Sequence, residues 1–166
     1  KKFKELTNFN HVGIVVEQKI TEILPLKNTF DQYIKEVGGS YKLIPYTTIQ
    51  DIMNGLEGVD AVYLAGGFFL SQNEVKQLAQ AFIDRKIPSF TTTNKKDVID
   101  GLFATNQEDD QLDILLRRIA LSIEAYVSGE KLADLPVLLE TNPRLTINYN
   151  TAEKIDVPIK YSLINS

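Results

Sequence analysis

The sequence predicts an α/β fold in which helices cover both faces of a parallel sheet. Strand-like and helix-like segments alternate as far as residue 107, which is the pattern of strand–helix–strand units. The first strand-like segment, at residues 11–16, is a short β-branched run without polar alternation, as expected for a strand buried on both faces. With 166 residues, of which 43% are apolar and 24% charged, the composition is that of a globular domain.

The first strand is expected over residues 11–16, where β-branched residues dominate. After Pro25, apolar residues recur at helical spacing until Gly38 and Gly39 end the helix. That apolar stripe consists of Leu26, Phe30, Tyr33, Ile34 and Val37.

Residues 41–46 read as a second strand that ends near Pro45. Thr48 and Asp51 have the spacing of a capping box, in which each residue binds the backbone of the other. The helix that follows carries its apolar residues on one face, namely Ile49, Ile52, Met53 and Leu56.

Residues 60–65 form the third predicted strand, and Gly66-Gly67 permits a tight turn at its end. The next helix begins with a second capping box, Ser71 and Glu74, and ends before Pro88. Its predicted buried stripe is Val75, Leu78, Ala79, Phe82 and Ile83.

Two more strands are expected over residues 89–92 and 102–105, with a short helix between them that Asn94 caps and that ends by Asp100. The first 107 residues therefore predict a Rossmann-like, three-layer lobe whose five-stranded parallel sheet has the order 2-1-3-4-5.

Residues 108–166 are expected to be a long helix and a C-terminal return segment that pack on this lobe. The long helix, over residues 108–128, carries apolar residues on two faces, which indicates contact with more than one layer. In the tail, residues 135–139 and 144–149 look strand-like, and Thr151 is a candidate cap for a last turn of helix.

Composition excludes several classes of function. The chain has no Cys and one His, which argues against disulfides, thiolate catalysis and metal sites. With 18 Lys and Arg against 22 Asp and Glu, the net charge is 18 − 22 = −4, which argues against nucleic-acid binding. No apolar run is long enough to span a membrane or to form a signal core, so a targeting segment of an exported form would lie outside this chain.

Candidate site residues follow the predicted strands, because ligands bind at the carboxyl edge of an open parallel sheet. Amides, hydroxyls and two aromatic rings dominate this set, which suits a site that holds a small polar or aromatic molecule. The predicted ligand-binding residues are Glu17, Gln18, Tyr46, Gly66, Gly67, Phe68, Phe69, Thr92, Thr93, Asn94 and Asn106. One of the two phenylalanine rings is expected to pack under the next helix and the other to be exposed.

Signs of catalysis are missing from the sequence. Neither a phosphate-binding loop nor a dinucleotide fingerprint occurs, so we expect no cofactor. The strand end at residues 65–67 is similar to that of hydrolases and amidotransferases, but it lacks a nucleophile, and His11 lies at the opposite end of its strand. The acidic residues 108–110 could bind a cation, but such residues commonly serve a helix N-terminus. We therefore predict that the chain is not an enzyme.

Five segments carry a resemblance to a known family. They are residues 58–63, 85–90 and 101–105, together with Ser-Gly-Glu-Lys-Leu-Ala-Asp-Leu-Pro at 128–136 and Leu-Thr-Ile-Asn-Tyr-Asn-Thr-Ala at 145–152. In this order they resemble the ABC-transporter substrate-binding proteins of the tryptophan-binding-like type, over nearly the whole chain. The resemblance implies a type I periplasmic binding protein fold, in which two lobes close on a ligand, and this chain matches the second lobe.

The resemblance places ligand-facing positions near Glu17 and Gln18, at residues 66–68, and at Thr92 and Thr93. The family often has Asn-Pro, Thr-Asp-Asn and Ser-Asp at these three places, and this sequence keeps none of them. That difference argues against recognition of a free amino acid through the family's usual contacts.

Two hypotheses follow. The first is an extracytoplasmic solute-binding domain, in the periplasm or cell envelope, that holds an amino acid or peptide-like molecule for a membrane transporter. The alternative is a degenerate domain that serves as an interaction or sensing module, because the family resemblance extends to forms fused to outer-membrane efflux channels or sensor kinases. Self-association through the helix at 108–128 is a further expectation.

Overall fold

The structure is a computed structural model that describes residues 1–67, 69–107, 111–135 and 144–159. Its sheet has six strands in the order β2-β1-β3-β4-β5-β6. The first five are parallel, which confirms the predicted order, and β6 pairs antiparallel with β5, so the predicted count of five was one short. The strands are β1 (His11–Glu17), β2 (Ser40–Tyr46), β3 (Ala61–Leu64), β4 (Ser89–Thr91), β5 (Ala104–Thr105) and β6 (Thr146–Ile147).

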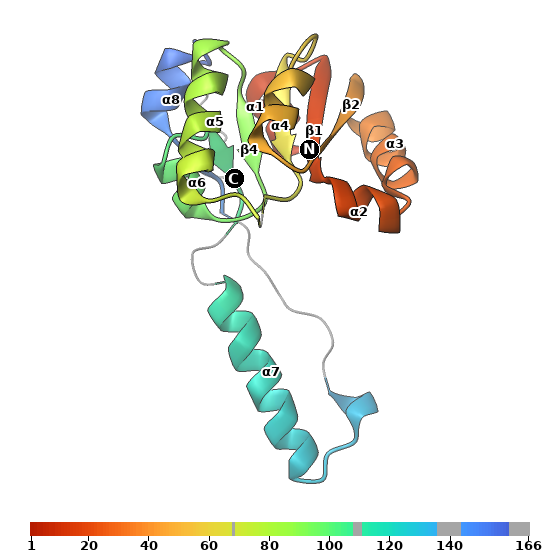
Figure 1. Ribbon diagram of the computed structural model, residues 1–166. Coiled ribbons are helices and arrows are strands. Elements are labelled where there is room, and N and C mark those ends of the chain that lie inside the picture. Colours follow the sequence, from red (N-terminus) through yellow and green to blue (C-terminus); the bar gives the residue numbers. More distant parts are fainter. Residues whose placement is uncertain (68, 108–110, 136–143, 160–166) are drawn as a thin grey trace.

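Helices cover both faces of this sheet and give the three-layer, Rossmann-like lobe that the sequence predicts (Figure 1). Side chains of α4 and α5 pack in one core cluster, and side chains of α1, α3 and α8 pack in the other. The helices are α1 (Lys2–Thr7), α2 (Gln18–Ile23), α3 (Leu26–Val37), α4 (Ile49–Gly55), α5 (Gln72–Asp84), α6 (Lys95–Ile99), α7 (Gln111–Val127), the 3-10 turn η1 (Leu132–Asp134) and α8 (Tyr149–Lys154).

Strand β1 divides its side chains between the two clusters. Val15 belongs to the cluster beside α4 and α5, whereas Val12, Ile14 and Val16 belong to the other. Successive residues of a strand point to opposite faces, and both faces of β1 are covered, which explains the uninterrupted apolar run. A Cβ on Gly13 would lie 2.7 Å from the Ile44 side chain, so the glycine makes room for a core residue of β2.

Helix caps follow the sequence closely. Both predicted capping boxes form, at Thr48 with Asp51 and at Ser71 with Glu74. The last helix differs: Asn148, not Thr151, caps α8 and accepts a hydrogen bond from the Thr151 backbone N–H at 3.0 Å. Thr151 lies one turn inside the helix, where its hydroxyl donates to the Gly101 carbonyl at 2.9 Å.

Two short helices were missed by the sequence prediction. Helix α1 buries only Phe3 and Leu6, and helix α2 has no buried residue, so neither produces an extended apolar stripe. The second strand, expected over residues 41–46, ends at Tyr46 as predicted and begins one residue earlier, at Ser40. Proline is tolerated in β2 because this strand is at the edge of the sheet.

Helix α7 stands apart from the lobe, together with η1 (Figure 1). No side chain described between Asp113 and Val127 is buried, although many are large and apolar. The acidic residues 108–110 lie outside the described residues, so the expected boundary at 107/108 falls at the edge of a described segment. Most of the strand expected at 135–139 also lies outside the described residues. In the described part of the chain, no helix combines the length and the apolar character needed to span a membrane.

Candidate functional site

The carboxyl ends of three neighbouring strands meet at Glu17. This last residue of β1 is only 4% exposed. Its Oε1 accepts a hydrogen bond from the Tyr46 hydroxyl at 3.0 Å and another from the Gly67 backbone N–H at 2.7 Å. Tyr46 ends β2 and Gly67 follows β3, so one carboxylate links the ends of three strands.

Gly66 is required by the same carboxylate. A Cβ built on Gly66 would lie 2.0 Å from Glu17 Oε2, far inside any non-bonded contact. Gly67 has a φ of +128°, a conformation that favours glycine. The sequence explains the two glycines by a tight turn, and the structure adds a steric reason at Gly66.

Tyr46 keeps its proton in this setting. Burial raises the pKa of the Tyr46 phenol, and the hydrogen bond to Glu17 and the charge of that carboxylate raise it further. The phenol therefore remains a hydrogen-bond donor throughout the physiological pH range.

Threonines after β4 form the next part of the edge. The Thr92 hydroxyl donates to the Leu64 carbonyl at 3.0 Å, and the Thr93 hydroxyl donates to the Asp97 carboxylate. The Thr93 methyl carbon would lie 3.5 Å from a Cβ on Gly67, so Thr93 adjoins the Glu17 group. Buried Asp97 was not among the predicted site residues; its only sequence signal is its position three residues after the cap Asn94.

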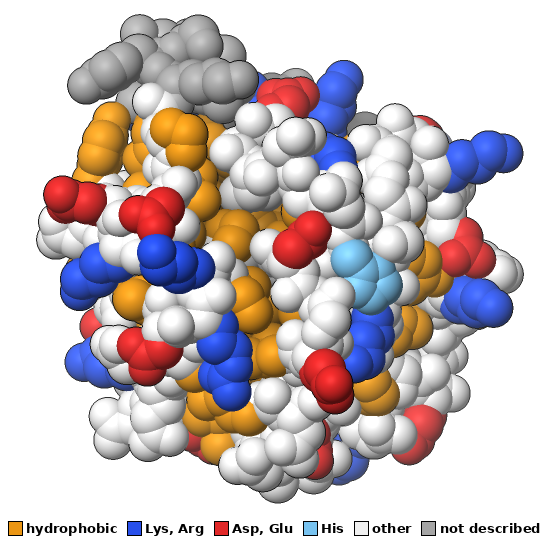
Figure 2. Space-filling model, turned by 90° about the horizontal axis from the view of Figure 1, so that it is seen from above, with side chains coloured by type: hydrophobic (Ala, Val, Ile, Leu, Met, Phe, Trp, Pro, Cys, Tyr) orange, Lys and Arg blue, Asp and Glu red, His pale blue; other side chains and the backbone are white. Residues whose placement is uncertain are grey.

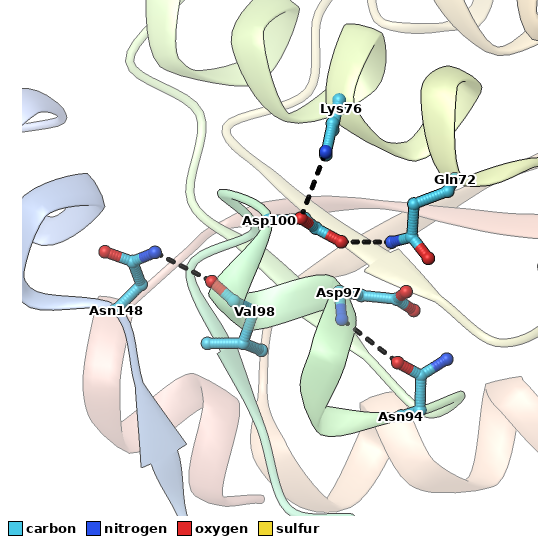
Figure 3. Close-up of polar contacts among 7 residues, drawn as sticks. All are labelled: Gln72, Lys76, Asn94, Asp97, Val98, Asp100 and Asn148. Atoms are coloured by element: carbon cyan, nitrogen blue, oxygen red, sulfur yellow. Dashed lines mark hydrogen bonds and ion pairs between the residues drawn. The ribbon is translucent and has the colours of Figure 1, made fainter.

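Asn94 is the N-cap of α6. Figure 3 shows its side chain turned toward the backbone of Asp97, whose N–H donates to Asn94 Oδ1 at 3.0 Å. Helix α6 is also held at its other end, where Asp100 pairs with Lys76 at 3.4 Å and accepts a hydrogen bond from Gln72. The Asn94 side-chain oxygen is thus used to cap helix α6.

The remaining predicted residues are spread along the edge. Gln18 is exposed and donates to Glu22 of its own helix at 3.1 Å, and Asn106 is half-buried just after β5. Phe69 is 79% exposed, whereas Phe68 lies outside the described residues. The structure therefore joins Glu17, Tyr46, Gly66, Gly67 and Thr93, and leaves Gln18 and Phe69 turned to solvent.

These site residues offer hydrogen-bonding groups and an exposed aromatic ring.

The single histidine lies away from the site. His11 begins β1, at the end of the strand opposite Glu17, and its Nδ1 lies 2.7 Å from the Ser40 hydroxyl. Among the described residues, no group of three or more His, Asp or Glu could hold a metal ion. On the face of the lobe turned away from α7, Lys and Arg are mixed with Asp and Glu (Figure 2).

Comparison with solved structures identifies the fold. A conserved domain protein from Vibrio cholerae matches 98% of this chain at 18% identity, with a TM-score of 0.77. The ABC domain of Streptococcus pneumoniae in complex with L-Trp matches the same share at 17% identity, also with a TM-score of 0.77. A ligand-free, open substrate-binding protein with adhesive properties from Clostridium difficile matches 96% of the chain at 16% identity, with a TM-score of 0.67.

The chain is similar in fold to a substrate-binding protein lobe. It spans about half of each structure matched, since it covers 55%, 56% and 54% of them respectively. The expected likeness to periplasmic binding proteins is thereby confirmed at the level of the fold. No family model matches the sequence, and no curated protein matches it either.

Proposed function

We propose that this chain is part of a two-lobed solute-binding protein that holds a small molecule without chemical change. The proposal rests on one observation above others. A loop whose backbone is fixed by buried Glu17 carries the exposed ring of Phe69 at the carboxyl edge of the sheet. In open parallel sheets this edge is where ligands bind.

The fixed loop favours binding over a purely structural role for Phe69. A phenylalanine that is 79% exposed adds nothing to the core, whereas its ring offers a flat apolar surface to a ligand or to a facing lobe. The neighbouring hydroxyls and amides can fix the orientation of an amino acid or peptide-like molecule. L-Trp in the Streptococcus pneumoniae structure is a ligand of this chemical class.

Helix α7 supports the two-lobed form. Its exposed apolar residues include Leu115, Leu116, Ile119, Leu121 and Ile123. A helix that is apolar on more than one face is normally buried. The structures that match this chain are nearly twice its length, so a second lobe of comparable size is the partner we propose for α7.

Transport is the context we propose for such binding. The fold likeness to substrate-binding proteins supports a role outside the cytoplasmic membrane, in the periplasm or cell envelope, as the soluble partner of an ABC transporter. The complete reading frame tests this part: an upstream lobe preceded by a secretion or lipoprotein signal agrees with it, and a cytoplasmic enzyme domain in that place contradicts it.

Ligand binding can be tested by thermal shift with a panel of amino acids and small peptides, on the chain together with any second lobe that its reading frame encodes. A ligand at 100 times its Kd stabilises a protein by about 2.7 kcal/mol. We expect at least one such response, and we expect Phe69→Ala to weaken it. Tyr149→Ala removes another exposed ring on α8 and is the matched control. A response that Phe69→Ala leaves unchanged would place the site elsewhere.

A second candidate function is an interaction or sensing module fused to an efflux channel or sensor kinase. The exposed faces of α7 favour it, because a protein partner could cover them equally well. The two functions predict different outcomes of the same panel. A module that has lost its ligand shows no thermal response in the two-lobed protein, and its α7 variants lose partner binding instead.

A further inference from the structure

A cavity of about 720 Å³ lies on the face of the sheet that α1 and α3 cover, away from the carboxyl edge. Its walls come from α1 and the residues after it, from β1 and β3, and from α3. It shares no residue with the candidate site around Glu17. Cavities of roughly 300–1,000 Å³ are the size of small-molecule sites in proteins.

Aromatic rings dominate the wall of this cavity. Five of the thirteen lining residues are aromatic: Phe3, Phe9, Phe30, Tyr33 and Tyr63. Phe3 and Phe9 lie 5.4 Å apart between ring centroids, and the ring of Tyr63 stacks on Phe90 at 5.8 Å, so one side of the cavity is a packed aromatic cluster. On the other side, α3 has no fully buried residue, and Tyr33 is 60% exposed, so the helix does not close over the sheet.

The polar groups of the cavity are few and balanced in charge. Among the side chains of the lining, the positive charges of Lys1 and Lys4 are matched by the negative charges of Glu5 and Glu36. Lys4 is already engaged, since its ammonium group lies 4.7 Å from the Phe9 ring centroid and donates to the Phe9 carbonyl. The Tyr63 hydroxyl makes no hydrogen bond to any residue in the described part of the chain, so it can bind a polar atom of a ligand.

We propose that this cavity binds a neutral aromatic molecule, with its ring among the phenylalanines and one polar atom on the Tyr63 hydroxyl. The balanced side-chain charges of the lining disfavour ions, because a buried charge without a partner is costly. Aromatic rings on the wall favour an aromatic body through stacking and edge contacts. This site is separate from the solute site proposed above, so either can exist without the other.

Indole is a suitable probe, and L-tryptophan is its matched counterpart, because it carries the same ring on a zwitterion. In amide-resolved NMR spectra of the whole chain, we expect millimolar indole to shift signals of α1, β1 and α3. L-Tryptophan should leave those signals unchanged or shift them at least tenfold less. Absence of indole shifts at these amides, or equal shifts with both probes, would overturn the proposal.

Variants test the position of the probe. Tyr63→Phe keeps the ring stack on Phe90 and removes only the hydroxyl, so we expect indole to bind about fivefold more weakly, which corresponds to one ordinary hydrogen bond. Ile34→Trp fills the cavity from α3 and should abolish the response, whereas Lys35→Trp adds the same side chain on the exposed side of that helix and should not. Phe69→Ala should also leave indole binding intact. Equal responses in the two tryptophan variants would contradict the proposal.

The same spectra show whether a second copy of the chain, instead of a small molecule, occupies the cavity. If a second copy of the chain covered the cavity, the α1 and α3 signals would move with protein concentration before any indole was added, and that result would also count against a small-molecule site. We expect spectra that do not depend on protein concentration.

Discussion

Glu17 shows how much one residue can contribute to the site. Its position after the first strand could be predicted from sequence, because strand ends in a parallel sheet are readily located. Its partners could not be predicted, since Tyr46 is 29 residues away and Gly67 is 50 residues away in the chain. Hydrogen bonds between distant segments depend on strand register, and composition and spacing do not encode register.

Gly66→Ala tests this residue-scale picture. The new Cβ would lie 2.0 Å from Glu17 Oε2, so we expect a loss of roughly 2–4 kcal/mol in the free energy of unfolding, measured with urea. In a Glu17→Ala background the clash is gone, and the same substitution should cost much less. Gly38→Ala is the control, because Gly38 has open space around its Cα but a φ of +77° and a ψ of 154°, a conformation nearly reserved for glycine; its cost of roughly 1–3 kcal/mol should be the same with and without Glu17→Ala. Additive costs for Gly66→Ala and Glu17→Ala would show that the two residues do not interact.

Helices were the best predicted elements wherever their signals are local. The caps at Thr48, Ser71 and Asn94 were all predicted correctly, because a capping residue and its partner are three residues apart. The cap of α8 was misassigned because Asn148 and Thr151 are both good capping residues and only the backbone position distinguishes them. The sheet order was also predictable, whereas the sixth strand, two residues long, gives almost no periodic signal.

The capping box of α5 makes a pH-dependent contribution to stability. Hydrogen bonds from the Ser71 hydroxyl and the Ser71 backbone N–H lower the pKa of Glu74 below its ordinary value of 4.5. Because the pKa is lower in the folded state, the contribution is present above that ordinary value and is lost as the pH falls through the folded pKa. Glu74→Gln should therefore be less stable at neutral pH and lose less stability than the parent between about pH 5 and pH 3.

Urea denaturation at several pH values measures this difference. Glu153→Gln, at an exposed position on α8, is the control and should keep the profile of the parent chain. A parent-like pH profile in Glu74→Gln would mean that the box contributes no pH-dependent stability.

At the scale of the whole molecule, the compact lobe and α7 differ in what supports them. The lobe has two buried clusters and a continuous sheet, whereas none of the described side chains of α7 is buried. Helix α7 has 17 residues, and most of the stability of helices in proteins comes from tertiary packing of an apolar face. The two apolar faces of α7 were visible in the sequence, and in the described part of the chain they remain exposed.

Amide hydrogen exchange tests that division. In the 166-residue chain we expect the amides of α7 to exchange within about two orders of magnitude of the free-peptide rate, while the amides of β1 exchange only through global unfolding. When a second lobe is supplied, in cis or in trans, α7 should become protected to the level of the lobe core, and Ile119→Glu should abolish that gain. Arg118→Glu, a charge change on a polar stripe of the same helix, is the matched control. Full protection of α7 in a monomeric chain without a second lobe would contradict this account, because the helix would then need no partner beyond its own residues.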